Sequence, residues 1–409
     1  MNVNNRWFQL GASLVAMIMI ANLQYAWTLF VNPLREGNGW TLAEVQWAFT
    51  VFILFQTWVQ PLDGWLIDRL GPRGFITAAG LLCGLGWAGM GYATSIPMLY
   101  ALYALAGTGA AFVYSGCIGG ALKWFHDRRG FASGVIAAGF GGGTALFIPV
   151  ISSIIANQGY REAFLYTGLL QGGVIFIVAQ FLRHPPHTAP ASTAAKAAAA
   201  KPQFTTAEMV RTPHFLVMYA MFVMMAIGGL MVTAQAGPMA ASWGLPIAAL
   251  TLAASVSPLA NAASRIFWGW ASDKIGREKS MIIAFVLQAA ALLLVLGVGH
   301  LSAIWFATTL VLVYFTWGEI YSLFPSLTGD YFGTKNATSN YAVMYTAKGV
   351  ASIVGGGLAA LLFERFGSWT AAFYGSAALA LIAAVLAVGL RAAGAPVKRA
   401  EPIPAPSAG

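Results

Sequence analysis

Three charged residues lie well inside long apolar stretches of this sequence: Arg265, Glu319 and Lys348. A basic residue at the centre of a membrane helix costs about 2.5–3.5 kcal/mol on insertion scales, and an ionisable group there marks a functional site by default. Arginine can hold a carboxylate through two parallel hydrogen bonds, whereas lysine acts as a compact point charge. Because the apolar stretches contain two cations and at most one anion, we expect a net positive site that binds a small carboxylate. A dicarboxylate could place one carboxylate near each cation.

The residues around Arg265 predict one polar face on an otherwise apolar helix. Ser257, Asn261 and Arg265 follow one another at intervals of four, and Trp268 comes three residues later. Residues at these intervals are neighbours on a helix surface. We expect Ser257 and Asn261 to form hydrogen bonds between helices, as small polar residues do in membrane bundles.

Aromatic residues are spaced so that they could enclose the same site. Tyr341, Tyr345 and Lys348 fall on one helix face, and Trp317 and Tyr321 share a face of another helix. Aromatic rings can cover the apolar part of a substrate while tyrosine hydroxyls donate hydrogen bonds to it. For each ring alone, ordinary packing explains its position equally well, so the prediction depends on the cluster.

Glu319 has no simple place in this site. It lies two positions from both Trp317 and Tyr321, about 200° round an ideal helix, so it should point away from a cavity that those rings face. Two roles stay open for it, a proton-binding group or a packing carboxylate. In a plainer alternative, Arg265 and Glu319 form an ion pair with a purely structural role, and Lys348 extends to the membrane interface.

The composition predicts an integral membrane protein built of helices. Of 409 residues, 58 % are hydrophobic and 9 % charged, whereas soluble domains carry roughly 25 % charged residues. The mean hydropathy is +0.71. Apolar runs reach about 20 residues, the length that crosses a bilayer as a helix. Twelve spans are expected, at about 8–30, 44–66, 74–94, 98–120, 131–157, 163–182, 214–236, 246–270, 281–299, 302–325, 339–363 and 369–390.

Several other classes of function are not expected. The two cysteines, Cys83 and Cys117, lie within apolar segments, and the five histidines show no ligand-like clustering, so we expect no metal and no cofactor. The spans contain no nucleophile with a nearby base, which argues against an enzyme. The net charge of +9 is scattered over short loops, a pattern that argues against nucleic-acid binding.

One long polar segment divides the spans into two groups of six. It is rich in Pro, Ala and Thr, and it predicts four regions: an N-terminal half over 1–182, a cytoplasmic linker over 183–213, a C-terminal half over 214–391, and a disordered cytoplasmic tail over 392–409. Of the 22 Lys and Arg residues, 17 fall on the side of the termini and linker, three on the other side, and two within spans. This asymmetry predicts that both termini lie in the cytoplasm.

The two groups of six repeat each other. Residues 64–73 read GWLIDRLGPR and residues 269–278 read GWASDKIGRE, each in a short loop after the second span of its half. Tyr114 and Tyr321 correspond in a weaker second match. Repeated halves are typical of secondary transporters, which bind substrate between the halves near the middle of the bilayer. Two glycine-rich runs, at 139–149 and 349–360, would let helices approach closely, either for sliding or for plain tight packing.

These motifs resemble the major facilitator superfamily. The loop pattern G-x-x-x-D-[RK]-x-G is the hallmark of that superfamily and occurs in both halves. More narrowly, the sequence is similar to the oxalate:formate antiporter family over nearly the whole chain outside the linker and tail. The segments that carry this similarity are LQYAWTLFVNP (23–33), ALYALAGTGAAFVY (101–114), WFHDRRGFASG (124–134), FWGWASDKIGR (267–277), YFTWGEIYSLFPS (314–326) and YTAKGVASIVGGG (345–357).

The resemblance implies roles for particular residues. The family binds substrate with an arginine in the eighth helix and a lysine in the eleventh, which match Arg265 and Lys348. Its enclosing residues match Tyr25 with the adjacent Gln24, Tyr114, Trp317, Tyr321 and Tyr345. Loop residues that hold one conformation match Asp68, Arg69, Asp273 and Lys274. The sequence departs from the family at Tyr345, where a tryptophan is expected, and at Glu319, where a small residue is expected.

The expected fold is therefore an all-α integral membrane protein, with twelve helices in two pseudo-symmetric halves. The expected function is exchange of small carboxylates, oxalate for formate or related acids, across the inner membrane by alternating access. The alternative is proton-coupled symport of a monocarboxylate such as lactate or formate, with Glu319 as the proton site. The expected partners are the substrate anions and the lipid bilayer, and the chain is expected to act as a monomer.

Overall fold

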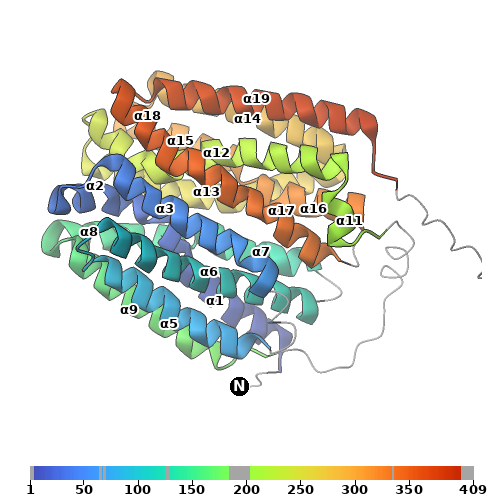
Figure 1. The fold of residues 1–409 in the computed structure, drawn as a ribbon, viewed down its shortest axis with the longest axis horizontal. Helices are drawn as coiled ribbons and strands as arrows, with labels where there is room; N and C mark the ends of the chain where they lie inside the picture. Colours follow the sequence, from blue (N-terminus) through green and yellow to red (C-terminus); the bar gives the residue numbers. More distant parts are fainter. Residues whose placement is uncertain are drawn as a thin grey trace, which may run out of the picture.

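The computed structural model describes residues 4–63, 67, 71–125, 129–183, 203–333 and 336–397, and within these ranges every regular element is a helix. The first half, drawn in blue to green in Figure 1, forms the lower part of that view. Its elements are α1 (Arg6–Tyr25), α2 (Trp27–Asn38), α3 (Leu42–Trp58), α5 (Pro72–Met90), α6 (Ile96–Trp124), α7 (Arg129–Gly142), the 3₁₀ turn η1 (Gly143–Leu146), α8 (Ile148–Gln158) and α9 (Tyr160–Ala179).

The second half, drawn in yellow-green to red, forms the upper part of Figure 1. Its elements are α11 (Thr206–Val210), α12 (Pro213–Ser242), α13 (Ile247–Ile275), α14 (Arg277–Val298), α15 (Ala303–Trp317), α16 (Ile320–Phe332), α17 (Ala337–Ser352), the π-helix η2 (Ile353–Leu358), α18 (Ala359–Phe366) and α19 (Thr370–Ala393). Several predicted spans are thus interrupted helices, among them α1–α2, α7–η1–α8, α15–α16 and α17–η2–α18.

The predicted spans correspond to the helices. Eleven helical stretches of the described residues are long and apolar enough to cross a membrane. The remaining predicted span, 74–94, is α5, with 19 residues. The first predicted span, 8–30, is formed by α1 and the start of α2, and the helix then continues to Asn38, well beyond the expected end. The structure thus confirms the all-helical membrane fold.

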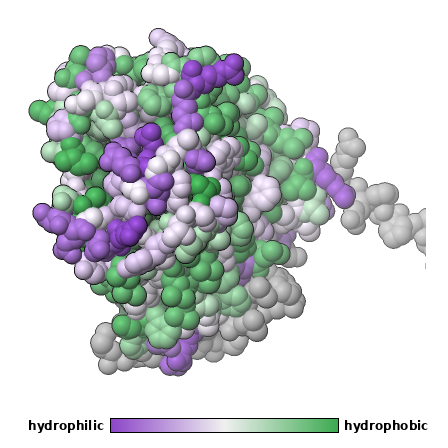
Figure 2. Space-filling model, turned by 60° about the vertical axis from the view of Figure 1, so that its left-hand side comes forward, coloured by the Kyte–Doolittle hydropathy of each residue, from purple (hydrophilic) through white to green (hydrophobic). Residues whose placement is uncertain are grey.

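The outer surface fits a lipid environment. Large apolar side chains are exposed on many helices, including Leu85 at 63 %, Ile266 at 67 % and Val385 at 71 %. Figure 2 shows apolar residues over much of one face, with hydrophilic residues gathered in patches. A soluble monomer rarely exposes large continuous apolar patches, so this surface requires an apolar solvent such as the bilayer core.

The predicted linker is described only at its two ends. Residues 203–213 lie against the second half: the Phe204 amide donates to the Phe332 carbonyl at 2.9 Å, and the Thr206 hydroxyl donates to Asn340 Oδ1 at 2.9 Å. The short helix α11 follows directly. This end of the linker is therefore folded and packed, where the sequence predicted only a polar connection. The first end, at Arg183, is described below. The predicted tail, 392–409, is described as far as Val397: α19 continues to Ala393, and His214 Nε2 lies 3.1 Å from the Gly394 carbonyl oxygen, whereas residues 398–409 lie outside the described residues.

The halves meet along three helix pairs, α2 with α12, α3 with α17–η2, and α7–η1 with α13. Hydrogen bonds cross between them at the end of the molecule away from the linker (Figure 1). The Gly237 amide donates to Thr28 Oγ1 at 2.5 Å. Gln46 Nε2 donates to Gln235 Oε1 at 3.0 Å, and Gln235 Nε2 donates to the Gly356 carbonyl at 2.9 Å. Buried amides thus join the halves where the chain passes from α17 into η2.

The glycine-rich runs lie at these contacts, which confirms the predicted close approach. A Cβ at Gly142 would lie 3.2 Å from the Cβ of Ala262 in α13 of the second half. At Gly356 and Gly357 a Cβ would overlap Thr50 and the Trp47 ring of α3, respectively. A side chain at these positions would press on a side chain of the other half, so glycine lets the helices lie close together.

Candidate functional site

Arg265 lies on α13 and extends toward the first half of the molecule. Its side chain is buried, and Nη1 donates to the Ala137 carbonyl of α7 at 2.9 Å. Nη2 donates to Oδ1 of Asn261, one turn back on α13, at 2.9 Å. The Nε–H has no hydrogen-bond partner among the residues that the structure describes. Two guanidinium nitrogens are thus held by neutral acceptors, and a third donor is free for a ligand.

Lys348 lies on α17, and its side chain is fully buried. Nζ donates to Gln24 Oε1 of α1 at 2.7 Å and to Gln56 Oε1 of α3 at 2.8 Å. The Tyr345 hydroxyl lies 3.4 Å from the same nitrogen. Three oxygens thus surround the ammonium, and none carries a full negative charge. This burial does not fit the alternative in which Lys348 reaches the membrane interface.

The two cations lie in one aromatic cluster. The Arg265 Cζ is 4.4 Å from the Tyr321 ring centroid, and Lys348 Nζ is 5.9 Å from the same centroid. The two charged groups are therefore no farther apart than the sum of these distances. Cations over aromatic faces gain stabilisation from the ring quadrupole, most strongly where water is excluded. The site thus compensates two like charges partly with π-faces.

The predicted enclosing residues all meet in this cluster. Tyr114 and Tyr345 stack with centroids 5.4 Å apart, and Tyr345 is 6.1 Å from Tyr321. Trp317 packs edge-on against Tyr321 at 5.5 Å. Tyr25 lies 5.6 Å from Phe140 of α7, a ring that also lies 5.5 Å from Lys348 Nζ. Four helices of the first half and three stretches of the second thus contribute to one compact group.

Unpaired donors gather in the same place. Four donors are buried without a hydrogen-bond partner in the described part of the chain: the hydroxyls of Tyr25, Tyr321 and Tyr341 and the indole Nε1 of Trp317. A buried donor left unpaired costs about 1–3 kcal/mol. An anion with several acceptor oxygens could satisfy many of these donors together. The chemistry of the cluster therefore favours a small anionic ligand rich in oxygen.

The cluster is closed to solvent on all sides. Arg265 is 5 % exposed, Tyr25 is 2 % exposed, and Lys348, Trp317 and Tyr345 are fully buried. A substrate could enter only if helices of the two halves separated on one side. This geometry corresponds to an occluded arrangement of a two-half bundle.

Glu319 is separate from the two cations. It is fully buried at the junction of α15 and α16, and within the described ranges neither carboxyl oxygen has a hydrogen-bond partner. In the part of the chain that the structure describes, Arg265 and Glu319 form no ion pair. The alternative in which Glu319 serves as the structural partner of Arg265 therefore lacks support.

The predicted gating residues are only partly described. Asp273 pairs with Arg277 of α14 at 2.6 Å. The Lys274 ammonium lies 4.2 Å from the Trp270 ring. Asp68 and Arg69 lie outside the described residues, so the equivalent arrangement in the first half cannot be compared.

Sequence reasoning missed three contributors to the cluster. These are Gln56, the Phe140 ring and the Ala137 carbonyl, which come from α3 and α7. The stretch GFGGG, in which Phe140 stands, was noted only for its glycines. The Cβ position of Gly141 lies 3.3 Å from Arg265 Nε, so that glycine makes room for the guanidinium. These contacts join different helices, so residue spacing within one helix does not predict them.

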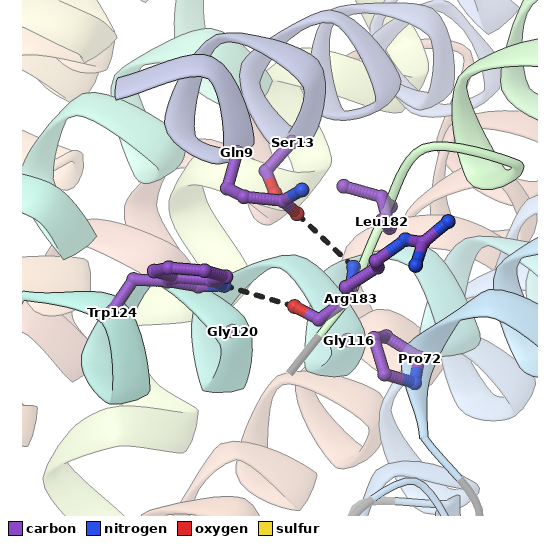
Figure 3. A pocket seen from close by; sticks show the side chains of 8 residues that line it. All are labelled: Gln9, Ser13, Pro72, Gly116, Gly120, Trp124, Leu182 and Arg183. Carbon is purple, nitrogen blue, oxygen red and sulfur yellow. Dashed lines mark hydrogen bonds between the residues drawn. The ribbon is translucent and has the colours of Figure 1, made fainter. Parts of the chain in front are cut away.

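A separate depression lies near the start of the linker (Figure 3). It is small, with a volume of about 10 Å³, and is lined by Gln9, Ser13, Pro72, Gly116, Gly120, Trp124, Leu182 and Arg183. Gln9 Oε1 accepts from the Arg183 amide at 3.1 Å, and Trp124 Nε1 donates to the Arg183 carbonyl at 2.9 Å. These bonds fasten the chain after α9 to α1 and α6. None of the predicted substrate-binding residues lines this depression.

Comparison with known proteins agrees with the geometry. The family model described as Major Facilitator Superfamily matches residues 12–235 and 216–407. The chain is 40 % identical to the oxalate:formate antiporter of Oxalobacter formigenes, over 94 % of this chain and 91 % of that protein. It is 26 % identical to the uncharacterized MFS-type transporter YhjX of Escherichia coli (strain K12), over 85 % of this chain and 86 % of that protein.

A more distant similarity involves monocarboxylate transporter 12 of Xenopus laevis, which is 23 % identical over 81 % of this chain and 76 % of that protein. The family match extends over both halves, and the identity to the Oxalobacter protein extends over nearly the full length of both chains. The chain belongs to the major facilitator superfamily and, within it, to the family of the oxalate:formate antiporter.

Proposed function

We propose that this protein exchanges small carboxylates, oxalate for formate or closely related acids, by alternating access. The observation that carries the proposal is the pair Arg265 and Lys348, two buried cations without a carboxylate partner in a closed aromatic cluster between the halves. The name of the Oxalobacter relative points to the same substrates.

The geometry suggests how a dicarboxylate is held. One carboxylate accepts from the guanidinium of Arg265, whose Nε–H is free. The other carboxylate takes a place at the ammonium of Lys348, next to the hydroxyl of Tyr345. Tyr25 and Tyr321 then donate from their unpaired hydroxyls. The rings of Tyr114 and Trp317 exclude water, and each ionic contact is stronger in this low-dielectric space.

Exchange follows from the cost of an empty site. Without an anion, two cations stay buried with only neutral acceptors, and a buried charge without a counter-charge is strongly unfavourable. Separation and re-closure of the halves should therefore occur much more readily with substrate than without it. The carrier then returns loaded with a second carboxylate, which is antiport.

The location and orientation are part of the proposal. We place the protein in the inner membrane with both termini and the linker in the cytoplasm, on the basis of the Lys and Arg asymmetry. The gating roles of Asp68, Arg69, Asp273 and Lys274 rest on the family pattern. The site is formed within one chain, so a monomer suffices for transport.

Glu319 supports a second candidate, proton-coupled symport of a monocarboxylate. Its carboxyl group is buried, and among the described residues it has neither a cation nor a hydrogen-bond partner. Binding and release of a proton by this group during the transport cycle could couple substrate flux to a pH gradient. The similarity to a monocarboxylate transporter agrees with this candidate.

One experiment separates the two candidates. Labelled oxalate uptake is measured in proteoliposomes that contain the purified chain and are loaded with oxalate, with formate, or with buffer at an imposed pH gradient. Antiport predicts uptake only into vesicles that hold a carboxylate. Uptake into buffer-loaded vesicles, driven by the pH gradient, would favour symport. Absence of oxalate uptake under every condition would refute the proposed substrate.

A further inference from the structure

Lys348 is held by side chains that belong to the opposite half. The lysine is on α17 of the second half, whereas Gln24 and Gln56 are on α1 and α3 of the first half. All three side chains are fully buried. This contact therefore joins the halves directly at the predicted substrate site.

The orientation of both glutamines is determined by the lysine. An ammonium group only donates hydrogen bonds, so each glutamine must turn its carbonyl oxygen toward Nζ. The amide nitrogens then point elsewhere, and neither Gln24 Nε2 nor Gln56 Nε2 finds a partner in the described structure. Two buried N–H₂ groups are left unpaired as a consequence of holding Lys348.

Carbonyl dipoles satisfy the geometry of the ammonium without its charge. A carboxylate oxygen in the same place would accept a hydrogen bond and also attract the ammonium through its full negative charge, which is a stronger interaction in this low-dielectric site. The glutamines are thus weak ligands that a substrate carboxylate can displace. Once displaced, their N–H₂ groups are free to turn and donate to the bound anion.

We propose that Gln56, together with Gln24, is a positioning residue that takes the place of the substrate carboxylate at Lys348 in the empty carrier. The inference rests on the proposed carboxylate exchange and adds a cause for how strictly that exchange is coupled. The glutamines stabilise the closed empty site too weakly for it to reorient readily. With a stronger acceptor at this position, the closed empty site would be stable enough for the carrier to reorient without substrate.

The test changes the charge of the acceptor at constant shape. In Gln56→Glu, a fixed carboxylate lies beside Lys348, so the empty carrier is paired and can reorient. Uptake of labelled oxalate into buffer-loaded proteoliposomes should then appear, at 10 % or more of the rate of exchange. The KM for oxalate should rise at least about tenfold, because substrate competes with an ionised acceptor.

Formate provides the readout that a merely structural defect would not produce. Oxalate needs both cations, whereas a monocarboxylate can be held by Arg265 alone. The KM for formate should therefore change less than about threefold, and the ratio of the two KM values should shift toward formate. A folding defect would lower the maximal rate for both substrates and leave this ratio unchanged.

Gln60→Glu is the matched control. Gln60 is also buried on the same segment, one helical turn beyond Gln56, and donates to the Gln56 carbonyl at 3.1 Å. The same charge placed one turn farther from Lys348 should leave the KM ratio within about threefold of the wild type. If Gln56→Glu does not fold, Gln24→Glu places the carboxylate on the other ligand of Lys348 and should cause the same shift.

The outcomes distinguish this inference from the proposed function. If the wild-type protein does not exchange oxalate, the proposed function fails. If the wild type exchanges oxalate and a folded Gln56→Glu or Gln24→Glu variant keeps the wild-type KM ratio and strict exchange, the positioning role of Gln56 is overturned. An equal shift in Gln60→Glu would also overturn it, since position would then not matter.

Discussion

The two buried cations meet the opposite half of the molecule in different ways. Arg265 is braced by Asn261 of its own helix and reaches a main-chain carbonyl of α7. Lys348 depends on two flexible amide side chains, from α1 and α3. A main-chain carbonyl inside a helix has a nearly constant position, whereas a glutamine side chain can turn away. The arginine is therefore suited to orient substrate, and the lysine to sense whether substrate is present.

The largest effect is expected at the sensing cation. Lys348→Gln removes one of two charges that attract a dicarboxylate, and loss of one partner of a buried charge contact costs about 2–5 kcal/mol. Oxalate exchange in proteoliposomes should fall at least ~30-fold. Binding of formate, which needs only one cation, should persist in an assay of protection against thermal unfolding. Oxalate exchange at the wild-type rate would refute the role of Lys348.

Exchange should depend on the shape of the Arg265 side chain as well as on its charge. Arg265→Lys keeps the charge but loses the planar fork and the stacking on Tyr321. The rate of oxalate exchange should fall about 10–100-fold, with formate exchange reduced to a similar extent. Initial rates of both exchanges measure this. A loss confined to oxalate would mean that both cations act as plain charges and that Arg265 does not orient the substrate.

Loss of the hydrogen bond between Asn261 and Arg265 should have a smaller effect. Asn261→Ala removes the acceptor of Nη2 but leaves the Ala137 carbonyl in place. A less well-oriented guanidinium should raise the KM for both substrates about 3–10-fold and leave the maximal rate near that of the wild type. Ser257→Ala, one turn back on the same face, is the control and should change KM less than about twofold. Equal effects of the two substitutions would argue for helix packing instead.

Glu319 should have the smallest effect on exchange. It contacts neither cation, so Glu319→Gln should change oxalate–formate exchange less than about twofold. If the protein is a proton-coupled symporter, the same substitution should abolish uptake driven by a pH gradient. Measuring both activities in one preparation assigns Glu319 either to packing or to coupling.

The sequence allowed the fold and the main members of the site to be predicted for clear physical reasons. In lipid, every backbone N–H and C=O group must be hydrogen-bonded within the protein, so each span is a helix. Its continuous apolar run can be located directly in the sequence. Charged residues inside such runs are rare, which is why Arg265 and Lys348 could be identified without any contact information. The aromatic residues near them then followed from helical spacing and from the family resemblance.

Other members of the site could not be found in this way. Gln56 and Lys348 are 292 positions apart, and their contact depends on how α3 packs against α17. Glutamine is not rare in these spans, so nothing marks Gln56 among the others. The Ala137 carbonyl is a main-chain group that every residue has. The interruption of several spans likewise depends on packing, since glycine and proline permit a break without requiring one.

The fit between η2 and α3 has a practical consequence. Where the chain widens into a π-helix, Gly356 and Gly357 touch α3 so closely that one added methyl group has no space. Alanine at either position would act as a wedge that holds this end of the seam apart while both cations remain intact. Such a variant would offer crystallographers and spectroscopists a molecule arrested partway through its cycle, obtained without an antibody, an inhibitor or a cross-link.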